Sequence, residues 1–429
     1  FYRERTDKKI SSNLFKAVAY AQNIGFNTDI NSIKNHQIRL NATYRQLQIL
    51  DTLLINNKPD NTLLGRIEYS PRLWKGFIQG SVFYELGFGL EQRREYAYVQ
   101  VATGQGQYYW NDYNGNGIKE LNEFEIALYA DQASYIKIYT PSNNYIKTEH
   151  HQFSGSLNLR PAMFKKTDSD KLIKFIARWA TQTVYRTDTK FIDENKNAFF
   201  NPITAQINDT VLISSNGLFR QSVFFNQSSP VGGFDYTYQD NQSKQVVTNG
   251  PESRLNKQHE LRTRINFTKS IGFFTSTTLG IKQSFAQFFT NRNYSIQTFE
   301  FEPKLTYQPN TTFRASAGYK RLEKTNAAEF GNQQSFTNDF LMELKMNQLS
   351  KGSFSMRMDY LIINYTGETN SPIAFEMLNS LKPGENFTWN ANYQQNLNSY
   401  LQISFNYEGR KSPGTKIIHI GGAQVRAFF

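Results

Sequence analysis

Strict alternation of apolar and polar residues over segments of about ten positions recurs along this chain, and this pattern limits the possible folds most. Adjacent residues of a β-strand point to opposite faces, so such alternation is typical of strands with one apolar and one polar face. Helical spacing of apolar residues is rare. The pattern therefore predicts an all-β protein. The clearest segments are residues 38–45, 173–179, 261–268, 354–360 and 401–407.

The length of these strands and the composition favour a membrane barrel over a soluble sandwich. A strand needs about 9–11 tilted residues to cross the hydrocarbon, with an apolar outer face and aromatic residues at both interfaces. Of the 429 residues, 15% are aromatic although only 39% are hydrophobic, and the mean hydropathy is −0.59. Apolar runs reach about five residues, whereas a spanning helix needs roughly 20. We predict a transmembrane antiparallel up-and-down β-barrel in one domain, residues 1–429.

The alternation of tight turns and long connections predicts about sixteen strands, within a range of about fourteen to eighteen. Two long extracellular segments are expected, residues 104–148 and residues 187–256, the second as an excursion or a plug. Strands are expected at 76–88, 95–103 and 171–186, among others. The tight turns are expected at 166–170, 270–271, 308–310, 348–351 and 396–398.

The C-terminal segment places Val425, Ala427 and Phe429 on one strand face and ends on an aromatic residue. It resembles the terminal strand of bacterial outer-membrane barrels, which serves as an insertion signal for the barrel insertion machinery. The abundance of Asn, Lys and Tyr resembles outer-membrane proteins of the Bacteroidota. These resemblances imply a location in the bacterial outer membrane, in contact with its lipid. Because no signal sequence precedes Phe1, we interpret the chain as mature or truncated.

One sharp motif, DYNGNGIKELNE, lies at residues 112–123. Calcium binds roughly six to eight oxygen ligands, which a short loop supplies from alternate positions and a final Glu. The motif resembles the calcium loops of EF-hand and dockerin-type proteins, and the resemblance implies a structural Ca²⁺. Its flanks are not helical and no second copy follows; the alternative is an ion-free turn rich in Asx and Gly. The matching ligands are Asp112, Asn114, Asn116, the Ile118 carbonyl, Glu120 and Glu123.

Basic residues outnumber acidic ones on the polar faces of the expected strands. In an open pore such charge concentrates anions, whereas in a closed pore the same groups pair with a plug or with one another. The pattern predicts a basic lumen without deciding between these states. The predicted pore-lining residues are Arg39, Arg45, Lys174, Arg178, Arg262, Arg264 and Arg357.

We recognise no catalytic motif in the sequence. The chain has no Cys and 5 His, and its formal net charge of +12 is scattered, which argues against a nucleic-acid partner. Our first hypothesis is a noncatalytic subunit of an outer-membrane complex for transport, secretion or envelope assembly. Its long loops would dock outer-membrane or surface lipoprotein subunits, or cap the lumen. The alternative is a porin-like channel for anionic or polar solutes, and an outer-membrane hydrolase ranks third.

Overall fold

The computed structural model describes most of the chain and is almost entirely β-structure. The described part contains twenty strands, of which β6 (Tyr108–Trp110) and β7 (Phe124–Ile126) have only three residues each. The other eighteen strands are 10 to 25 residues long. The predicted class, all-β with antiparallel up-and-down strands, is confirmed. The eighteen long strands lie at the top of the range expected from the sequence. The described residues are 1–11, 14–55, 59–164, 170–192, 211–247, 250–348 and 351–428.

The chain forms two compact units. The first comprises residues 1–94, 141–223 and 240–252. Its strands pair antiparallel with their neighbours from β1 to β5, and the series continues through the β5–β8, β8–β9 and β9–β10 pairs. The strands that lie wholly or largely in it are β1 (Tyr2–Ser11), β2 (Leu14–Ile30), β3 (His36–Ile49), β4 (Asp60–Leu73), β5 (Ile78–Gln100), β8 (Tyr135–Leu159), β9 (Trp179–Ile192) and β10 (Leu212–Phe225).

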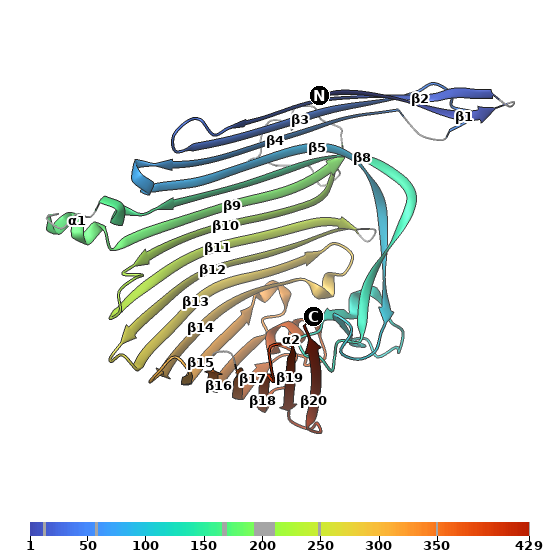
Figure 1. The fold of residues 1–429 in the computed structure, drawn as a ribbon. Coiled ribbons are helices and arrows are strands. Elements are labelled where there is room, and N and C mark those ends of the chain that lie inside the picture. Colours follow the sequence, from blue (N-terminus) through green and yellow to red (C-terminus); the bar gives the residue numbers. More distant parts are fainter. Residues whose placement is uncertain are drawn as a thin grey trace. The chain divides into compact units, whose positions relative to one another are not determined.

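The second unit comprises residues 95–140, 224–239 and 253–429. From β13 to β20 each strand pairs antiparallel with the next along the chain, as Figure 1 shows for these strands. The strand β11 (Gly232–Val247) is divided between the units. The other strands are β12 (Gly250–Asn266), β13 (Ile271–Ala286), β14 (Tyr294–Tyr307), β15 (Phe313–Asn326), β16 (Gln334–Gln348), β17 (Gly352–Thr366), β18 (Gly384–Asn396), β19 (Leu401–Lys411) and β20 (Ile418–Ala427).

The helices in the described part of the chain are all short. Among the described residues, no helix is both long and apolar enough to cross a membrane. The α-helices are α1 (Lys171–Ile176) and α2 (Pro372–Leu378), and the 3₁₀ helices are η1 (Trp74–Gly76), η2 (Leu121–Glu123), η3 (Pro161–Phe164), η5 (Thr290–Arg292) and η6 (Ala328–Phe330).

The alternation in the sequence becomes two chemically different sheet faces in the second unit. On β14, Glu300 and Lys304 lie on one face, and Phe301 and Leu305 on the other. The cross-strand register keeps this separation, since Leu305 lies opposite Ala317, which in turn lies opposite Met342. The second face, which we call the apolar face, carries large apolar side chains that are solvent-exposed. They include Leu279, Phe301, Leu305, Phe340, Met342, Phe405 and Val425.

Tight turns alternate with longer connections in the second unit, as predicted. Side-chain oxygens stabilise the tight turns: Oδ1 of Asn310 accepts hydrogen bonds from the backbone N–H groups of Thr312 and Phe313, at 3.0 and 2.9 Å. Such Asx turns reverse the chain within a few residues. The longer connections, at 287–293, 327–333, 367–383 and 412–417, all lie at the opposite strand ends. Parts of two predicted turns, residues 166–169 and 349–350, lie outside the described residues.

Several expected boundaries in the first unit are wrong. One continuous strand, β5, replaces the two expected at 76–88 and 95–103, and β1 was not expected. Residues 171–176 form α1 rather than the start of a strand, because the Lys174 and Ala177 N–H groups donate to the Asp170 and Ile173 carbonyls. A six-residue segment is too short for its apolar period to distinguish helix from strand.

The expected excursion at 187–256 is also wrong, because it contains the end of β9, the strands β10 and β11, and the start of β12. Ser, Asn and Gln occupy both faces of β10 and β11, so backbone pairing rather than alternation makes them strands. Its residues 193–210 lie outside the described residues. The excursion expected at 104–148 is shorter, because residues 135–148 belong to β8.

Candidate functional site

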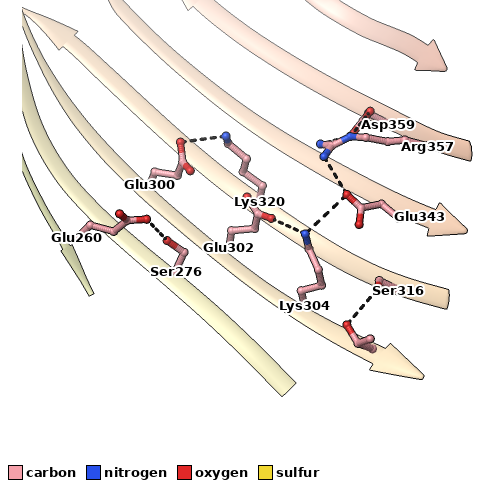
Figure 2. Close-up of polar contacts among 11 residues, drawn as sticks. Glu260, Ser276, Glu300, Glu302, Lys304, Ser316, Lys320, Glu343, Arg357 and Asp359 are labelled. Carbon is pink, nitrogen blue, oxygen red and sulfur yellow. Dashed lines mark hydrogen bonds and ion pairs between the residues drawn. The ribbon is translucent and has the colours of Figure 1, made fainter. Parts of the chain in front are cut away.

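The polar side of the sheet in the second unit carries a chain of ion pairs, which Figure 2 shows. We call this side, which bears Glu300, Lys304, Lys320, Glu343 and Arg357, the polar face. Lys320 lies 2.9 Å from Glu300, and Arg357 lies 3.2 Å from Glu343. Lys304 lies between Glu302 and Glu343, at 3.2 and 3.8 Å. The register makes these contacts possible by placing Glu343 directly opposite Arg357. Neighbouring charges therefore neutralise one another locally.

The predicted pore-lining residues have different environments. Arg39 pairs with Glu68 and Asp29, at 3.2 and 3.4 Å, and Arg262 pairs with Glu260 at 2.7 Å. Arg357 also pairs with Asp359, at 2.7 Å.

The other four predicted pore-lining residues have environments of their own. Arg264 donates to the Gln227 and Ser229 carbonyls, at 3.3 and 2.8 Å. Arg45 lines a pocket in the first unit together with Arg3 and Arg5. Lys174 lies in α1 and Arg178 precedes β9, so the prediction that both lie on a strand is wrong.

A short helix covers one end of the polar face. The Ser371 hydroxyl caps α2 by accepting a hydrogen bond from the Ala374 N–H at 3.2 Å, and Pro372 begins the helix. On the buried side of α2, Met377 is 1% exposed and packs against Ile296 of β14. Ile296 lies on the polar face, four residues before Glu300 on the same strand. Full burial of each such side chain stabilises by about 1.5–3 kcal/mol. The end of the polar face that meets α2 is therefore apolar.

Two lysines of the polar face hold the C-terminal half of α2. The Lys324 ammonium donates to the carbonyls of Glu376 and Met377 and to Oδ1 of Asn379, each at 3.0 Å. Lys282 pairs with the Glu376 carboxylate at 2.5 Å. The last carbonyls of a helix have no partner within the helix, so a lysine ammonium there satisfies them and interacts favourably with the helix dipole. Both ends of α2 are thus anchored.

The long connection at 101–134 packs onto the α2 connection. Its two short strands, β6 and β7, pair with each other. The side-chain amides of Asn111 and Asn370 bond at 3.1 Å, and Asn370 also donates to the Asp112 carbonyl at 3.2 Å. The Tyr109 and Phe375 rings stack with centroids 6.3 Å apart. Residues 101–134 and 367–383 therefore form one packed layer, which we call the cap.

Two ion pairs join the cap to other parts of the second unit, one to η5 and one to β19. Glu125 pairs with Arg292 at 2.8 Å, and Asp131 pairs with Arg410 at 2.5 Å. Burial raises the pKa of the Glu125 carboxyl, and the Arg292 guanidinium opposes this rise. The Arg410 guanidinium also lies over the Tyr129 ring, 4.1 Å from its centroid. The cap is thus held over the polar face by charged as well as apolar contacts.

The predicted calcium loop lies within the cap. Asp112 accepts hydrogen bonds from the N–H groups of Gly115 and Gly117, at 2.7 and 2.8 Å, and both glycines have the positive φ that such a tight loop requires. Asn116 accepts one from the Ile118 N–H at 2.6 Å. Carboxylate, amide and carbonyl oxygens suit a hard cation, so the donor set fits calcium. Within the described residues, no three or more His, Asp or Glu side chains are grouped so that they could hold a metal ion.

The two remaining acidic ligands of the predicted loop accept hydrogen bonds from within the cap. Glu123 is 1% exposed and accepts hydrogen bonds from the Tyr113 N–H and the Trp110 indole N–H, at 3.2 and 2.9 Å. Glu120 accepts one from the Asn114 side chain at 3.0 Å. The six predicted ligands are close in sequence and lie in one loop, where the acidic side chains accept hydrogen bonds from N–H groups of the cap.

The predicted insertion signal lies on the last strand. Val425 and Ala427 pair with Ile403 and Leu401 of β19, and Val425 belongs to the apolar face. Phe429 lies outside the described residues.

The cap anchors were not found from the sequence, although one signal for them exists. Ser371 followed by Pro372 is a recognisable start of a helix. Arg410 and Lys324 carry no local signal, because their partners lie far away along the chain.

No protein-family model matches the sequence, and no curated protein matches it. Among solved structures, the chain is similar to the ferric-catecholate import receptor Fiu from E. coli K12, with 9% identity and a TM-score of 0.38. That match covers 91% of this chain, which spans 57% of the receptor's length. Pseudomonas aeruginosa OccK11 (OpdR) matches with 10% identity and a TM-score of 0.36, covering 100% of this chain and 94% of that chain. The P pilus usher PapC matches with 6% identity and a TM-score of 0.18, covering 96% of each chain. At such TM-scores the similarities carry no argument about function.

Proposed function

We propose that this chain is a noncatalytic bacterial outer-membrane β-barrel whose lumen is the polar face and whose outer surface is the apolar face. The exposed apolar side chains support this, because a soluble protein rarely exposes so extended an apolar surface, whereas lipid would cover it. The strands of 10 or more residues are long enough to cross the hydrocarbon.

The docked cap is the observation that carries the functional proposal. A layer joined by two ion pairs, an anchored helix and stacked aromatic rings covers one end of the polar face in the second unit. Such an arrangement favours a gated subunit of an outer-membrane complex, serving transport, secretion or envelope assembly. A partner, such as another outer-membrane or surface lipoprotein subunit, would supply the free energy that displaces the cap.

A porin-like channel for anionic or polar solutes is the second candidate. The pocket lined by Arg3, Arg5 and Arg45 favours it, because clustered guanidinium groups attract anions and, among the described residues, Asp7 pairs with Arg5 alone, at 3.0 Å. The paired charges on the polar face, in contrast, give little net attraction for either ion.

Single-channel conductance of the folded, detergent-purified chain in a planar bilayer tests the proposal. We expect a closed channel with rare openings, and copurification of partner subunits from native membranes. Large, steady, anion-selective steps from the unaltered chain would contradict the capped state and support the porin.

We also propose that Ca²⁺ binds the loop at 112–123 and stiffens the cap. Limited proteolysis of residues 104–134, with calcium and with chelator, measures this. Calcium should protect the unaltered loop, and the double variant Asp112→Asn with Glu123→Gln should lose that protection while the barrel stays folded. Glu329→Gln, in a neighbouring connection, is the control. Calcium-dependent protection that persists in the double variant would overturn the site.

A further inference from the structure

The connection between β8 and β9 contains a short amphipathic helix, α1, whose apolar side is exposed. With 3.6 residues per turn, Lys171 and Lys174 fall on one side of α1 and its four apolar residues on the other. No side chain of α1 is buried, and Leu172 is 68% exposed. The exposed apolar residues of α1 are Leu172, Ile173, Phe175 and Ile176.

Two 3₁₀ helices extend this exposed apolar surface. The helix η3 contacts α1, and the ring centroids of Phe164 in η3 and Phe77 are 4.9 Å apart. The Arg160 N–H also donates to the Phe77 carbonyl at 2.8 Å, which joins the start of η3 to the end of η1. We call the exposed apolar side chains of α1, η1 and η3 the interfacial patch, and Figure 1 shows α1 beyond the end of β9. Besides the four residues of α1, the patch comprises Trp74, Met163 and Phe164.

The charged residues beside the interfacial patch are almost all basic. The described residues of 72–77, 160–164 and 170–178 include six basic residues and one acidic residue, Asp170. All six basic side chains are exposed, and none forms an ion pair within the described part of the chain. This end of the strands therefore presents unpaired positive charge around an apolar surface. The six basic residues are Arg72, Lys75, Arg160, Lys171, Lys174 and Arg178.

We propose that the interfacial patch binds anionic phospholipids of the periplasmic leaflet, with its apolar side chains at the boundary between headgroups and acyl chains. This inference rests on the proposed barrel, which would hold these strand ends at the bilayer surface. A helix with apolar residues on one side and Lys or Arg on the other is suited to such an interface. Lys and Arg lay their alkyl stems along apolar surface and keep their charged ends among the headgroups. One lipid surface thus covers the apolar residues and also pairs with the cations.

The lengths of the neighbouring connections support the periplasmic side. Outer-membrane barrels have short periplasmic turns and longer extracellular loops. At the strand ends that carry the patch, the connections at 31–35 and 74–77 are short. The Arg72 N–H donates to the Asn35 carbonyl at 2.8 Å, which places these two connections side by side. The connection at 160–178 is longer, and its additional length contains η3 and α1.

Quenching of a single fluorophore by phospholipids with brominated acyl chains tests the proposal, in vesicles of phosphatidylethanolamine and phosphatidylglycerol. The chain has no Cys, so Leu172→Cys can carry one bimane label. Met342→Cys, on the apolar face, reports insertion of the barrel, and Leu53→Cys, 94% exposed in the 50–59 connection, is the control outside the patch. We expect lipid quenching at positions 172 and 342 and none at position 53. At position 172, brominated phosphatidylglycerol should quench more strongly than brominated phosphatidylcholine, whereas at position 342 the two should quench equally.

Removing a charge from α1 should reduce the headgroup preference. An anionic surface favours each nearby Lys or Arg by about fivefold, so Lys174→Gln should lower the preference for phosphatidylglycerol at position 172 by up to about fivefold. Lys416→Gln, which removes an exposed lysine from the 412–417 connection, should leave that preference unchanged. Both lysines are exposed, so we expect both variants to fold.

The outcomes separate this inference from the proposed barrel. A label that is quenched at position 342 but not at position 172 would overturn the interfacial patch and leave the barrel intact. Absence of quenching at both positions would contradict both proposals. Equal quenching by the two headgroups at position 172, or an unchanged preference in Lys174→Gln, would overturn the assignment to anionic lipid.

Discussion

Removing the carboxylate of Asp131 should loosen the cap. Asp131 and Arg410 are 21% and 11% exposed at their side chains, so their ion pair is largely shielded from water. Breaking a buried pair by removing one partner costs about 3–5 kcal/mol. Asn at position 131 keeps one acceptor oxygen and water reaches the site in part, so we expect about 2 kcal/mol for Asp131→Asn. Because about 1.4 kcal/mol is tenfold, cap opening should become roughly 30-fold more frequent.

The assay is single-channel recording, with protease sensitivity of residues 104–134 as an independent measure. Arg410→Met and the double variant complete a thermodynamic cycle that isolates the pair from other effects of each substitution. Glu329→Gln removes an exposed carboxylate from the 327–333 connection and should leave opening unchanged. The reasoning is refuted if Asp131→Asn opens no more often than the control, or if the two single effects simply add.

Three further outcomes follow from the cap. The chain has no Cys, so the double variant Asn111→Cys with Asn370→Cys can form only one disulfide. This disulfide should abolish openings, and reductant should restore them; openings that continue in the oxidised variant would contradict the docked cap. Met377→Ala should destabilise the docked cap by about 2–5 kcal/mol, seen as faster cleavage at 104–134, whereas unchanged cleavage would show that α2 does not anchor it. Burial on docking raises the pKa of Glu125 above its ordinary 4.5 and outweighs the opposing effect of Arg292, so the neutral carboxyl favours docking more than the ion pair does. This contribution is complete below pH 4.5 and is lost as pH rises through the raised pKa. Openings should therefore become rarer as pH falls through the raised pKa, and Glu125→Gln should remove this dependence; a rise in openings with acid in the unaltered chain would reverse the assigned sign.

The sequence predicted the strands of the second unit better than those of the first. In residues 299–305 of β14 and 353–360 of β17, polar or charged residues alternate with apolar ones, so local period alone identifies strand and face there. In β10 and β11 polar residues occupy both faces, and only pairing with neighbouring strands satisfies their backbone groups. The counting of turns then placed residues 187–256 outside the sheet, although residues 218–225 and 234–238 look strand-like in the sequence.

The chemistry of the candidate site divides in the same way. The loop at 112–123 was visible because all its oxygen ligands lie within one short segment. The cap was not, because Asp131 and Arg410 are 279 residues apart and neither is unusual in its own segment.

The sequence by itself determined which residues face each way along a strand, since adjacent side chains on an extended backbone must point to opposite sides. It also determined that long apolar faces exist and that one loop carries calcium-type ligands. The tertiary structure decided that Glu343 meets Arg357, that α2 and the 101–134 connection form one cap, and that Phe77 meets Phe164. The physical reason is that these contacts depend on register and chain packing over long sequence separations, which no local period encodes.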